Sequence, residues 1–277
     1  MISAIHDLID LALREDIGTG DITSETTIPD DVMAKGIILS KDEGIIVGLD
    51  VAGEVFHSID AEVDFNKLVS DGDKIAKDQE LVVIEGKASS LLTAERIALN
   101  FLQRLSGVAT TTSRYVEAVS GQKAQVVDTR KTTPGWRALE KYAVRIGGGG
   151  NHRFGLYDAV LIKDNHIAVA GSITKAVSGA RGRIPHTMKI EVETKTLDEV
   201  QEAIESKADI IMLDNMSLDM MSEAVKLING KAIVEASGGI KLENITSVAA
   251  TGVDLISVGA LTHSAMSLDI SMDTVLK

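Results

Sequence analysis

The sequence contains no cysteine among its 277 residues, and several other residue types are scarce. Without cysteine the chain can form no disulfide, present no thiolate nucleophile and build no cysteine-ligated metal site. Aromatic residues make up only 3% of the chain, so the core must be filled by aliphatic side chains, as in the interior of an α/β fold. Apolar residues reach 44%, which is enough for a packed core and argues against global disorder.

The chain also has few positive charges: it contains 28 lysine and arginine residues and 41 acidic residues, which gives a net charge of −13. A pI near 4.9 argues against a general nucleic-acid-binding protein, which needs a wide basic face. The sequence has no apolar run of about 18 residues that would predict a membrane span. We interpret residues 1–16 as an amphipathic acidic helix rather than a signal peptide, and we expect a cytoplasmic location.

One segment reverses this charge balance. Residues 128–166 carry seven lysine and arginine residues against four acidic ones, together with four consecutive glycines and two histidines. Like charges around a cleft repel one another unless an anion fills it. The segment therefore predicts a binding site for a small, multiply charged anion.

The first part of the chain mixes helices with short strands. Apolar spacing predicts a helix over residues 3–16, and residues 33–48 and 62–87 read as short strands around charged turns. A further helix is predicted over residues 89–106, ending at Gly107, because glycine is a common residue just after a helix C-terminus.

From about residue 124, short apolar runs alternate with helical segments. The six runs end near Asp128, Lys163, Glu193, Asp214, Ser237 and Gly259. The last three intervals are 21, 23 and 22 residues, about one strand–helix unit each. Such spacing indicates right-handed βαβ crossovers and a parallel sheet. We predict a barrel of the β/α type rather than an open dinucleotide-binding sheet, because no G-x-G-x-x-G follows a strand at the expected place.

Polar residues or glycines end every predicted strand. Barrels of this type carry their active sites at the carboxyl ends of the strands. The predicted rim therefore brings together cations, carboxylates and glycines: Arg130, Lys131, Lys163, Glu193, Asp214, Ser237, Gly238 and Gly239. Arginine suits planar carboxylates through its two-pronged guanidinium, whereas lysine acts as a point charge for carboxylate or phosphate. Arg153, after the glycine run 147–150, adds a further cation beside His152.

Each of these features also has a simpler interpretation. Glu193 and Asp214 can face a sugar hydroxyl, a divalent metal or a developing positive charge, or they can merely pair with nearby cations. The glycines after the last strands can cradle a phosphate, or they can only make tight turns. On the helix over residues 89–106, Arg104 shares a polar face that periodicity alone interprets as solvated. The sequence has no serine nucleophile elbow and no zinc-ligand spacing.

The ordered motifs DTRKTTPG, GGGGNHR, YDAVLIKDNHI, IEVET, IIMLDN and EASGGI resemble the quinolinate phosphoribosyltransferase family. LREDIGTGDIT and TAERIALNFLQRLSG resemble it too, so the similarity covers nearly the whole chain. The resemblance implies an incomplete (seven-stranded) α/β barrel over residues 108–268 with an N-terminal α/β sandwich domain over residues 1–107. It also implies that a C-terminal tail, residues 269–277, packs on the first domain.

The resemblance further implies an activity and an assembly. Quinolinate and 5-phosphoribosyl 1-pyrophosphate would give nicotinate mononucleotide, CO2 and pyrophosphate, with Mg2+ as cofactor, in NAD biosynthesis. The protein would be a homodimer with shared active sites, with a hexamer as a larger alternative.

Site residues are carried over from the same resemblance. Quinolinate would contact Arg104 of the partner subunit, Thr129, Arg130, His152, Arg153 and Lys163. The phosphoribosyl substrate would contact Lys131, Glu193, Asp214, Ser237, Gly238, Gly239, Val258, Gly259 and Ala260. Lys131, Glu193 and Asp214 would be catalytic, and Mg2+ would bind mainly through substrate, with Glu193 and Asp214 as candidate protein ligands.

Three other functions are compatible with this sequence. A ModD-type relative, associated with molybdenum uptake, shares the fold and part of the motif set. A barrel aldolase would use Lys131 or Lys163 as a Schiff base. A non-catalytic dimer would only bind a dicarboxylate, but such a protein has no use for Glu193 and Asp214 beside bound anions.

Overall fold

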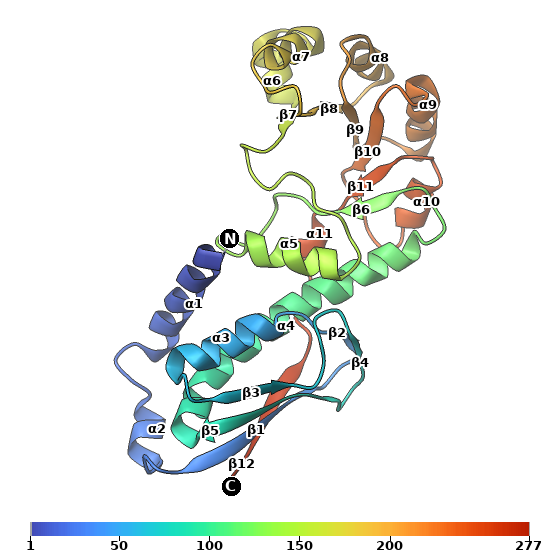
Figure 1. The fold of residues 1–277 in the computed structure, drawn as a ribbon. Coiled ribbons are helices and arrows are strands. Elements are labelled where there is room, and N and C mark those ends of the chain that lie inside the picture. Colours follow the sequence, from blue (N-terminus) through green and yellow to red (C-terminus); the bar gives the residue numbers. More distant parts are fainter. Residues whose placement is uncertain (1, 277) are drawn as a thin grey trace. The chain divides into compact units, whose positions relative to one another are not determined.

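The computed structural model of the chain describes residues 2–276 and separates into two compact units (Figure 1). The first unit contains the residues up to Thr112, Thr133–Gly148 and the residues from Ser264 on. The second contains Ser113–Thr132 and Gly149–His263. The domain boundaries expected from the sequence follow another division and stay a prediction.

A four-stranded antiparallel sheet forms the centre of the first unit, in the order β12-β1-β5-β3. Its strands are β1 (Met33–Ser40), β3 (Asp64–Lys67), β5 (Glu80–Lys87) and β12 (Ile270–Leu276). Alternate residues of β1 are buried, as expected for a strand with one face on a core. A second, two-stranded sheet pairs β2 (Gly44–Ile45) with β4 (Lys74–Ile75). The strands expected in residues 33–48 and 62–87 are thus confirmed.

The helices of the first unit supply its apolar core. They are α1 (Ile2–Ile17), α2 (Ile22–Thr27), α3 (Leu49–Ile59), α5 (Arg137–Ile146) and most of α4 (Ala88–Ala118). Figure 1 shows α3 and α4 running along the four-stranded sheet, and the rings of Phe56 on α3 and Phe65 on β3 lie 5.7 Å apart. The helix expected over residues 3–16 is confirmed as α1.

Gly107 does not end a helix, contrary to the expectation from the sequence. Helix α4 continues through it to Ala118. A side chain at Gly107 would collide with the backbone carbonyl oxygen of Met266. The glycine therefore permits the close approach of another backbone segment, and helical hydrogen bonding continues through the position.

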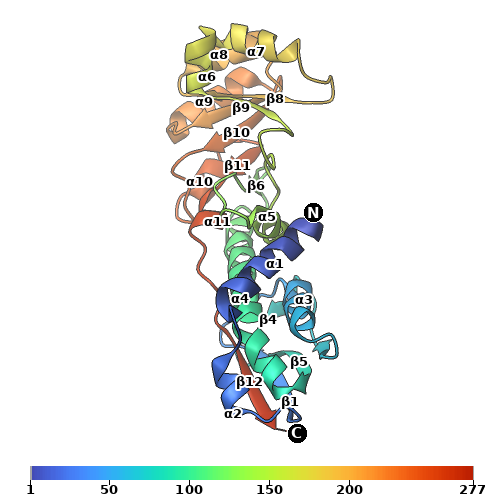
Figure 2. The same ribbon diagram turned by 90° about the vertical axis from the view of Figure 1, so that its left-hand side faces the viewer.

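The second unit is built on a parallel sheet in the order β6-β11-β10-β9-β8-β7. The strands are β6 (Gln125–Val127), β7 (Val160–Ile162), β8 (Ile190–Thr194), β9 (Ile210–Asp214), β10 (Ile233–Ser237) and β11 (Leu255–Ser257). All six apolar runs identified in the sequence are therefore strands. The unit's helices are α6 (Asp164–Ala170), α7 (Ile173–Arg181), α8 (Leu197–Glu205), α9 (Leu218–Ile228), α10 (Ile245–Ala249) and α11 (Ala260–His263). Figures 1 and 2 show α7 to α10 along the outer side of the strands.

Where a seventh strand is expected, only one residue pairs with the sheet. Gly150 forms a single parallel bridge with Val127, on the edge of β6 that β11 leaves open. Its N–H donates to Val126 O at 2.8 Å, and its carbonyl accepts from Asp128 N at 3.1 Å. Glycine weakens a strand because it has no side chain to pack, so the run 147–150 does not extend the bridge. The α/β fold class is confirmed, with six strands in the described part of the barrel sheet.

Polar residues occur inside this sheet as well as at its end. Every residue of β8 is buried, including Glu191 and Glu193, and Glu235 is buried on β10. These charged side chains in the barrel interior need partners or a function. Among the described residues, no helix is both long enough and apolar enough to cross a membrane.

Candidate functional site

A pocket of about 450 Å³ opens at the carboxyl ends of the parallel strands in the second unit. Cations, carboxylates and glycines surround it, as the rim expected from the sequence requires. The lining residues are Thr129, Arg130, Lys131, His152, Arg153, Leu161, Lys163, Glu193, Met212, Asp214, Asn215, Glu235, Ser237, Gly238, Gly239 and Ser257. The strand ends thus bring the expected cations and carboxylates to one place.

Four expected site residues do not line this pocket. Arg104 belongs to the first unit, and Val258, Gly259 and Ala260 follow β11 without lining the cavity. Gly259 still lies beside the site, because a Cβ built on it would be 3.1 Å from Cδ of Lys131. The roles of these residues stay predictions.

Lys163 and Glu193 form an ion pair across neighbouring strands, with Nζ 2.5 Å from Oε2. Lys163 precedes α6 at the end of β7, and its side chain is half exposed. The Glu193 carboxylate, near the end of β8, is almost fully buried. Because one end of this pair is open to solvent, the lysine can exchange the glutamate for an anionic ligand.

Arg130 and Arg153 place two positive charges in the same pocket. The pKa of the Arg153 guanidinium is lowered from its usual value, first by burial and then by the charge of Arg130. Two like charges held close together in a partly buried site favour a bound anion, which offsets their repulsion. The geometry therefore supports the anion site expected from the basic segment.

The backbone around Lys131 is fixed on both sides. Its N–H donates to Thr129 Oγ1 at 3.0 Å, and its carbonyl accepts from Thr262 Oγ1 at 2.7 Å. The side chain itself is exposed. The lysine can therefore reach into the pocket from a fixed base.

His152 lies over two buried glutamates. Its Nε2 is 3.0 Å from Glu191 Oε2 and 3.7 Å from Glu235 Oε1. Burial lowers the pKa of His152. The hydrogen bond and charge of Glu191, together with the charge of Glu235, raise the pKa by more, so the net shift is upward. The Arg153 N–H, however, donates to Nδ1 at 2.8 Å, so Nδ1 carries no proton. The hydrogen bond decides the tautomer, because a proton on Nδ1 would point at that N–H.

The sequence did not predict Glu191 and Glu235 as site residues, and it predicted His152 only as a contact of quinolinate. Their ligand atoms lie within 4.8 Å of one another, a spacing that also suits a metal ion. The positive charge of Arg153 already acts on both Glu191 and His152. A divalent cation there would face this charge, so we do not interpret the group as a metal centre.

Two consecutive glycines shape the loop after β10. Gly238 and Gly239 have φ angles of +91° and +62°, which L-residues with a side chain rarely adopt. A Cβ on Gly238 would collide with the side chain of Asn215, which itself lines the pocket. Asn215 N in turn donates to Ser237 O at 2.9 Å. Helix α10 begins only at Ile245, so the backbone of this loop, rather than a helix N-terminus, adjoins the pocket.

Arg104 has a partner within the first unit. Its Nη2 lies 2.7 Å from Glu140 Oε1, and its Nη1 donates to Ala265 O at 2.8 Å. Glu140 is fully buried and also accepts hydrogen bonds from the N–H and hydroxyl of Thr133. The guanidinium is therefore held in a defined orientation.

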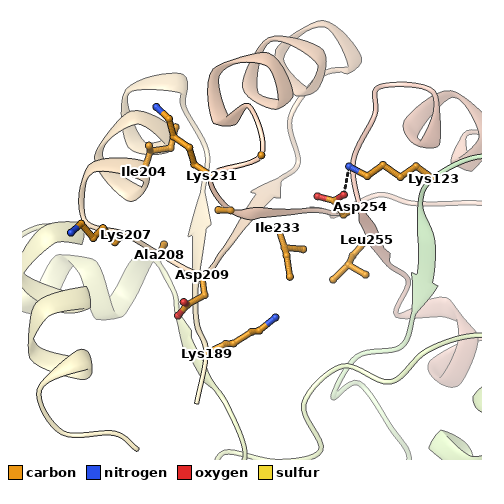
Figure 3. Close-up of a pocket in the computed structure, with 12 residues that line it drawn as sticks. Lys123, Lys189, Ile204, Lys207, Ala208, Asp209, Lys231, Ile233, Asp254 and Leu255 are labelled. Carbon is orange, nitrogen blue, oxygen red and sulfur yellow. Dashed lines mark ion pairs between the residues drawn. The ribbon is translucent and has the colours of Figure 1, made fainter. Parts of the chain in front are cut away.

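A larger cavity, about 870 Å³, lies at the opposite, amino-terminal ends of the barrel strands (Figure 3). Four lysines line it with Asp209 and Asp254, and Lys123 pairs with Asp254 at 2.5 Å. The lysines are exposed side chains, and active sites in barrels of this type form at the other end. We therefore assign the candidate site to the smaller pocket.

Comparisons with known proteins show the family to which the chain is similar. The family models for the N-terminal and C-terminal domains of quinolinate phosphoribosyl transferase match residues 21–106 and 108–273. A probable nicotinate-nucleotide pyrophosphorylase [carboxylating] of Bacillus subtilis is 47% identical over 272 residues, covering 98% of this chain and 94% of its own length. Quinolinate phosphoribosyltransferase [decarboxylating] 1b of Nicotiana tabacum is 43% identical over 287 residues, covering 97% and 81%.

A solved structure shows the same fold. The crystal structure of NadC from Streptococcus pyogenes superposes with a TM-score of 0.95 at 45% sequence identity, covering 99% of this chain and 97% of that chain. An α/β barrel with an additional N-terminal domain is thereby confirmed.

Proposed function

Because the chain belongs to the quinolinate phosphoribosyltransferase family, we propose that its pocket transfers a phosphoribosyl group to quinolinate with loss of CO2. The donor is 5-phosphoribosyl 1-pyrophosphate, and the products are nicotinate mononucleotide, CO2 and pyrophosphate, as required in NAD biosynthesis. One observation carries the proposal: a single pocket contains the Arg130–Arg153 cation pair together with the carboxylates of Glu193 and Asp214.

Quinolinate carries two carboxylates, which the cations of the pocket can hold. Arg130 and Arg153 offer guanidinium groups that suit planar carboxylates, and Lys163 adds a point charge. Thr129 and His152 complete this end of the pocket, although both ring nitrogens of His152 contact protein atoms here. The cations would hold two mutually repelling anions in reactive proximity.

The phosphoribosyl donor would occupy the other side of the pocket. Ser237, Gly238 and Gly239 offer a loop that a phosphate can approach closely, and Val258, Gly259 and Ala260 continue this surface from β11. Lys131 lies between the two substrates in this arrangement. Glu193 and Asp214 would face the ribose hydroxyls.

Chemistry in this arrangement needs no protein nucleophile. As pyrophosphate departs, the ribose carbon gains positive charge, which the carboxylates of Glu193 and Asp214 stabilise as fixed negative charges. The pyridine nitrogen attacks that carbon, and the ring becomes cationic. The cationic ring then favours loss of the adjacent carboxylate, because it stabilises the electron pair left behind.

Mg2+ is the cofactor that we propose for this reaction. Glu193 and Asp214 end neighbouring strands and present carboxylate oxygens, the ligand type that Mg2+ prefers. Mg2+ would bind mainly through substrate oxygens and would supply positive charge that offsets the charge of the pyrophosphate group.

Arg104 would serve the active site of a partner subunit in a homodimer. Glu140 holds its guanidinium in one orientation, which suits a side chain that binds an anion across an interface. Assembly of dimers into hexamers is compatible with this arrangement. We also propose a cytoplasmic location, as expected from the sequence.

The test is a product assay with quinolinate, 5-phosphoribosyl 1-pyrophosphate and Mg2+. We expect nicotinate mononucleotide and CO2 in equal amounts. No product, or equal product from nicotinate without CO2, would overturn the proposal. The similarity to relatives named as carboxylating pyrophosphorylases favours this activity over that of a ModD-type protein. A Schiff-base aldolase would instead be trapped by borohydride with a carbonyl substrate.

A further inference from the structure

Two glutamates lie inside the barrel without a full set of partners. Glu191 on β8 and Glu235 on β10 are 4% and 1% exposed. One oxygen of each, Oε1, is buried and has no hydrogen-bond partner among the described residues. Two adjacent buried carboxylates cannot both carry a full negative charge at little cost. One of them must therefore hold a proton around neutral pH.

His152 determines which glutamate holds it. The ring has one proton, on Nε2, because Nδ1 accepts the N–H of Arg153. That proton is directed at Glu191 Oε2 at 3.0 Å, whereas Glu235 Oε1 is 3.7 Å away, beyond a normal hydrogen bond. The ring proton is therefore used by Glu191, and Glu235, which receives no hydrogen bond from the ring, is the glutamate that remains protonated.

Burial and the negative charge of Glu191 favour the protonated form of Glu235, whereas His152 and Ser257 favour the carboxylate. Glu191 faces it from β8, His152 from the segment before β7, and Ser257 from β11, while Met212 on the intervening strand β9 is apolar. Burial, followed by the negative charge of Glu191, raises the pKa of Glu235 to about 7. A carboxylic acid in this range can give up a proton and regain it near neutral pH.

The reaction proposed for this pocket needs such a proton. When CO2 leaves the ribosylated ring, the C–C bond breaks heterolytically and its electron pair stays on the ring carbon. That carbon becomes C–H in the product, so one proton must be delivered there. Glu235 lines the same pocket as Arg130, Arg153 and Lys163, which we assign to the quinolinate carboxylates.

We propose that Glu235 is the general acid that protonates the ring carbon vacated by CO2, with burial and the neighbouring Glu191 keeping it in its protonated form. This inference rests on the proposed function. The carboxyl proton of Glu235 moves to the carbanion, the ring carbon gains hydrogen, and Glu235 is left as a carboxylate. Solvent reprotonates it before the next turnover.

The decisive variant is Glu235→Gln, which keeps the size of the side chain and removes the acid. Pyrophosphate release and nicotinate mononucleotide formation are measured separately in the same reaction. Because general acid catalysis contributes about 10²- to 10⁴-fold, nicotinate mononucleotide formation should fall by about 10²-fold or more. Pyrophosphate release in the first turnover should fall much less. Because a carbanion that is not protonated recombines with the CO2 still in the pocket, the ribosylated intermediate that still has both carboxylates should accumulate and be visible by mass spectrometry.

Two further variants separate an acid from a structural role. Glu235→Asp keeps a carboxyl group and should recover part of the decarboxylation rate. Glu191→Gln removes the charge that raises the pKa of Glu235, so the fall of decarboxylation at high pH should move to lower pH. In Glu235→Gln this pH dependence should disappear. Glu223→Gln, an exposed change on α9, should match the wild type.

The two proposals fail in distinguishable ways. If the wild type forms no nicotinate mononucleotide, the proposed function itself is wrong. In the second case the wild type is active, and circular dichroism shows that Glu235→Gln is folded. If this variant then releases pyrophosphate and nicotinate mononucleotide together at the wild-type rate, decarboxylation needs no acid from Glu235. Equal losses in both products without any intermediate would likewise contradict the role of Glu235 as the acid.

Discussion

Lys163 Nζ lies 2.5 Å from Glu193 Oε2, joining the ends of neighbouring strands β7 and β8. This pair places a half-exposed cation beside a nearly buried carboxylate at the mouth of the pocket. A bound dicarboxylate would draw the ammonium group toward itself and leave the glutamate for the ribose. The pair thus connects the two proposed substrate positions.

Replacing Lys163 with methionine should weaken use of quinolinate more than use of the phosphoribosyl donor. Hydrogen bonds to charged groups contribute about 1.5–3 kcal/mol, so kcat/KM for quinolinate should fall roughly 10- to 100-fold. Steady-state kinetics with each substrate varied in turn measures the difference. Lys195→Met is the matched control, because Lys195 pairs with Asp164 nearby but does not line the pocket. Equal losses in the two variants would contradict the assignment of Lys163.

Glu235 should also give the protein a distinctive dependence of stability on pH. Its pKa is raised from 4.5 to about 7, so the folded state binds more protons than the unfolded state between these values. Stability from this group is full below about pH 4.5 and falls as the pH rises through 7, by no more than about 3 kcal/mol. Urea unfolding of Glu235→Gln should therefore show a gain over the wild type that is larger at pH 8 than at pH 5. A constant difference across this range would show that Glu235 ionises normally.

The strand ends of the barrel could be predicted from the sequence because they follow a simple physical pattern. Short apolar runs at intervals of 21 to 23 residues require parallel strands, and parallel strands end at one edge. Lys163, Glu193, Asp214 and Ser237 were therefore expected together, and all of them line the pocket. The pattern does not predict which ion pairs these side chains form.

Glu235 was missed, although the sequence holds a signal for it. Side chains alternate along a strand, so Glu191 shares a face with Glu193, and Glu235 shares one with Ser237. Two glutamates within buried strands on the side of the site residues indicate a charged group beneath the pocket. Their contact with His152 depends on the turn after Gly150, which no local pattern specifies. Gly107 is a similar case, because only the approach of Met266 distinguishes it from a helix end.

Arg104 should be recoverable by mixing subunits if it serves a partner's site. Arg104→Ala and Lys163→Ala are each expected to be nearly inactive. In a random mixture of dimers, about one quarter of the sites would be intact, so activity should return toward about one quarter of the wild-type value. Arg96→Ala is the control on the same helix, since its side chain is exposed, and it should be active without mixing.

A mixture that stays inactive tests the shared site only if the subunits have exchanged and both variants are folded. Mass spectrometry of tagged subunits reports the exchange. Loss of Arg104 leaves the buried carboxylate of Glu140 without this cation, so the melting temperature of Arg104→Ala must be measured alongside. Inactive but exchanged and folded mixtures would contradict a shared active site.

Gly238→Ala should impair the phosphoribosyl side of the pocket. The alanine would adopt a φ of +91° and its Cβ would collide with Asn215, so the loop must move or Asn215 must rotate. Strain of this kind costs about 1–3 kcal/mol, and we expect a similar loss in the free energy of unfolding. The KM for 5-phosphoribosyl 1-pyrophosphate should rise more than the KM for quinolinate. Gly179→Ala, in α7 with open space around its Cβ, should leave both KM values unchanged. Equal rises of both KM values in Gly238→Ala would indicate a general distortion of the pocket and contradict a phosphate-binding role for this loop.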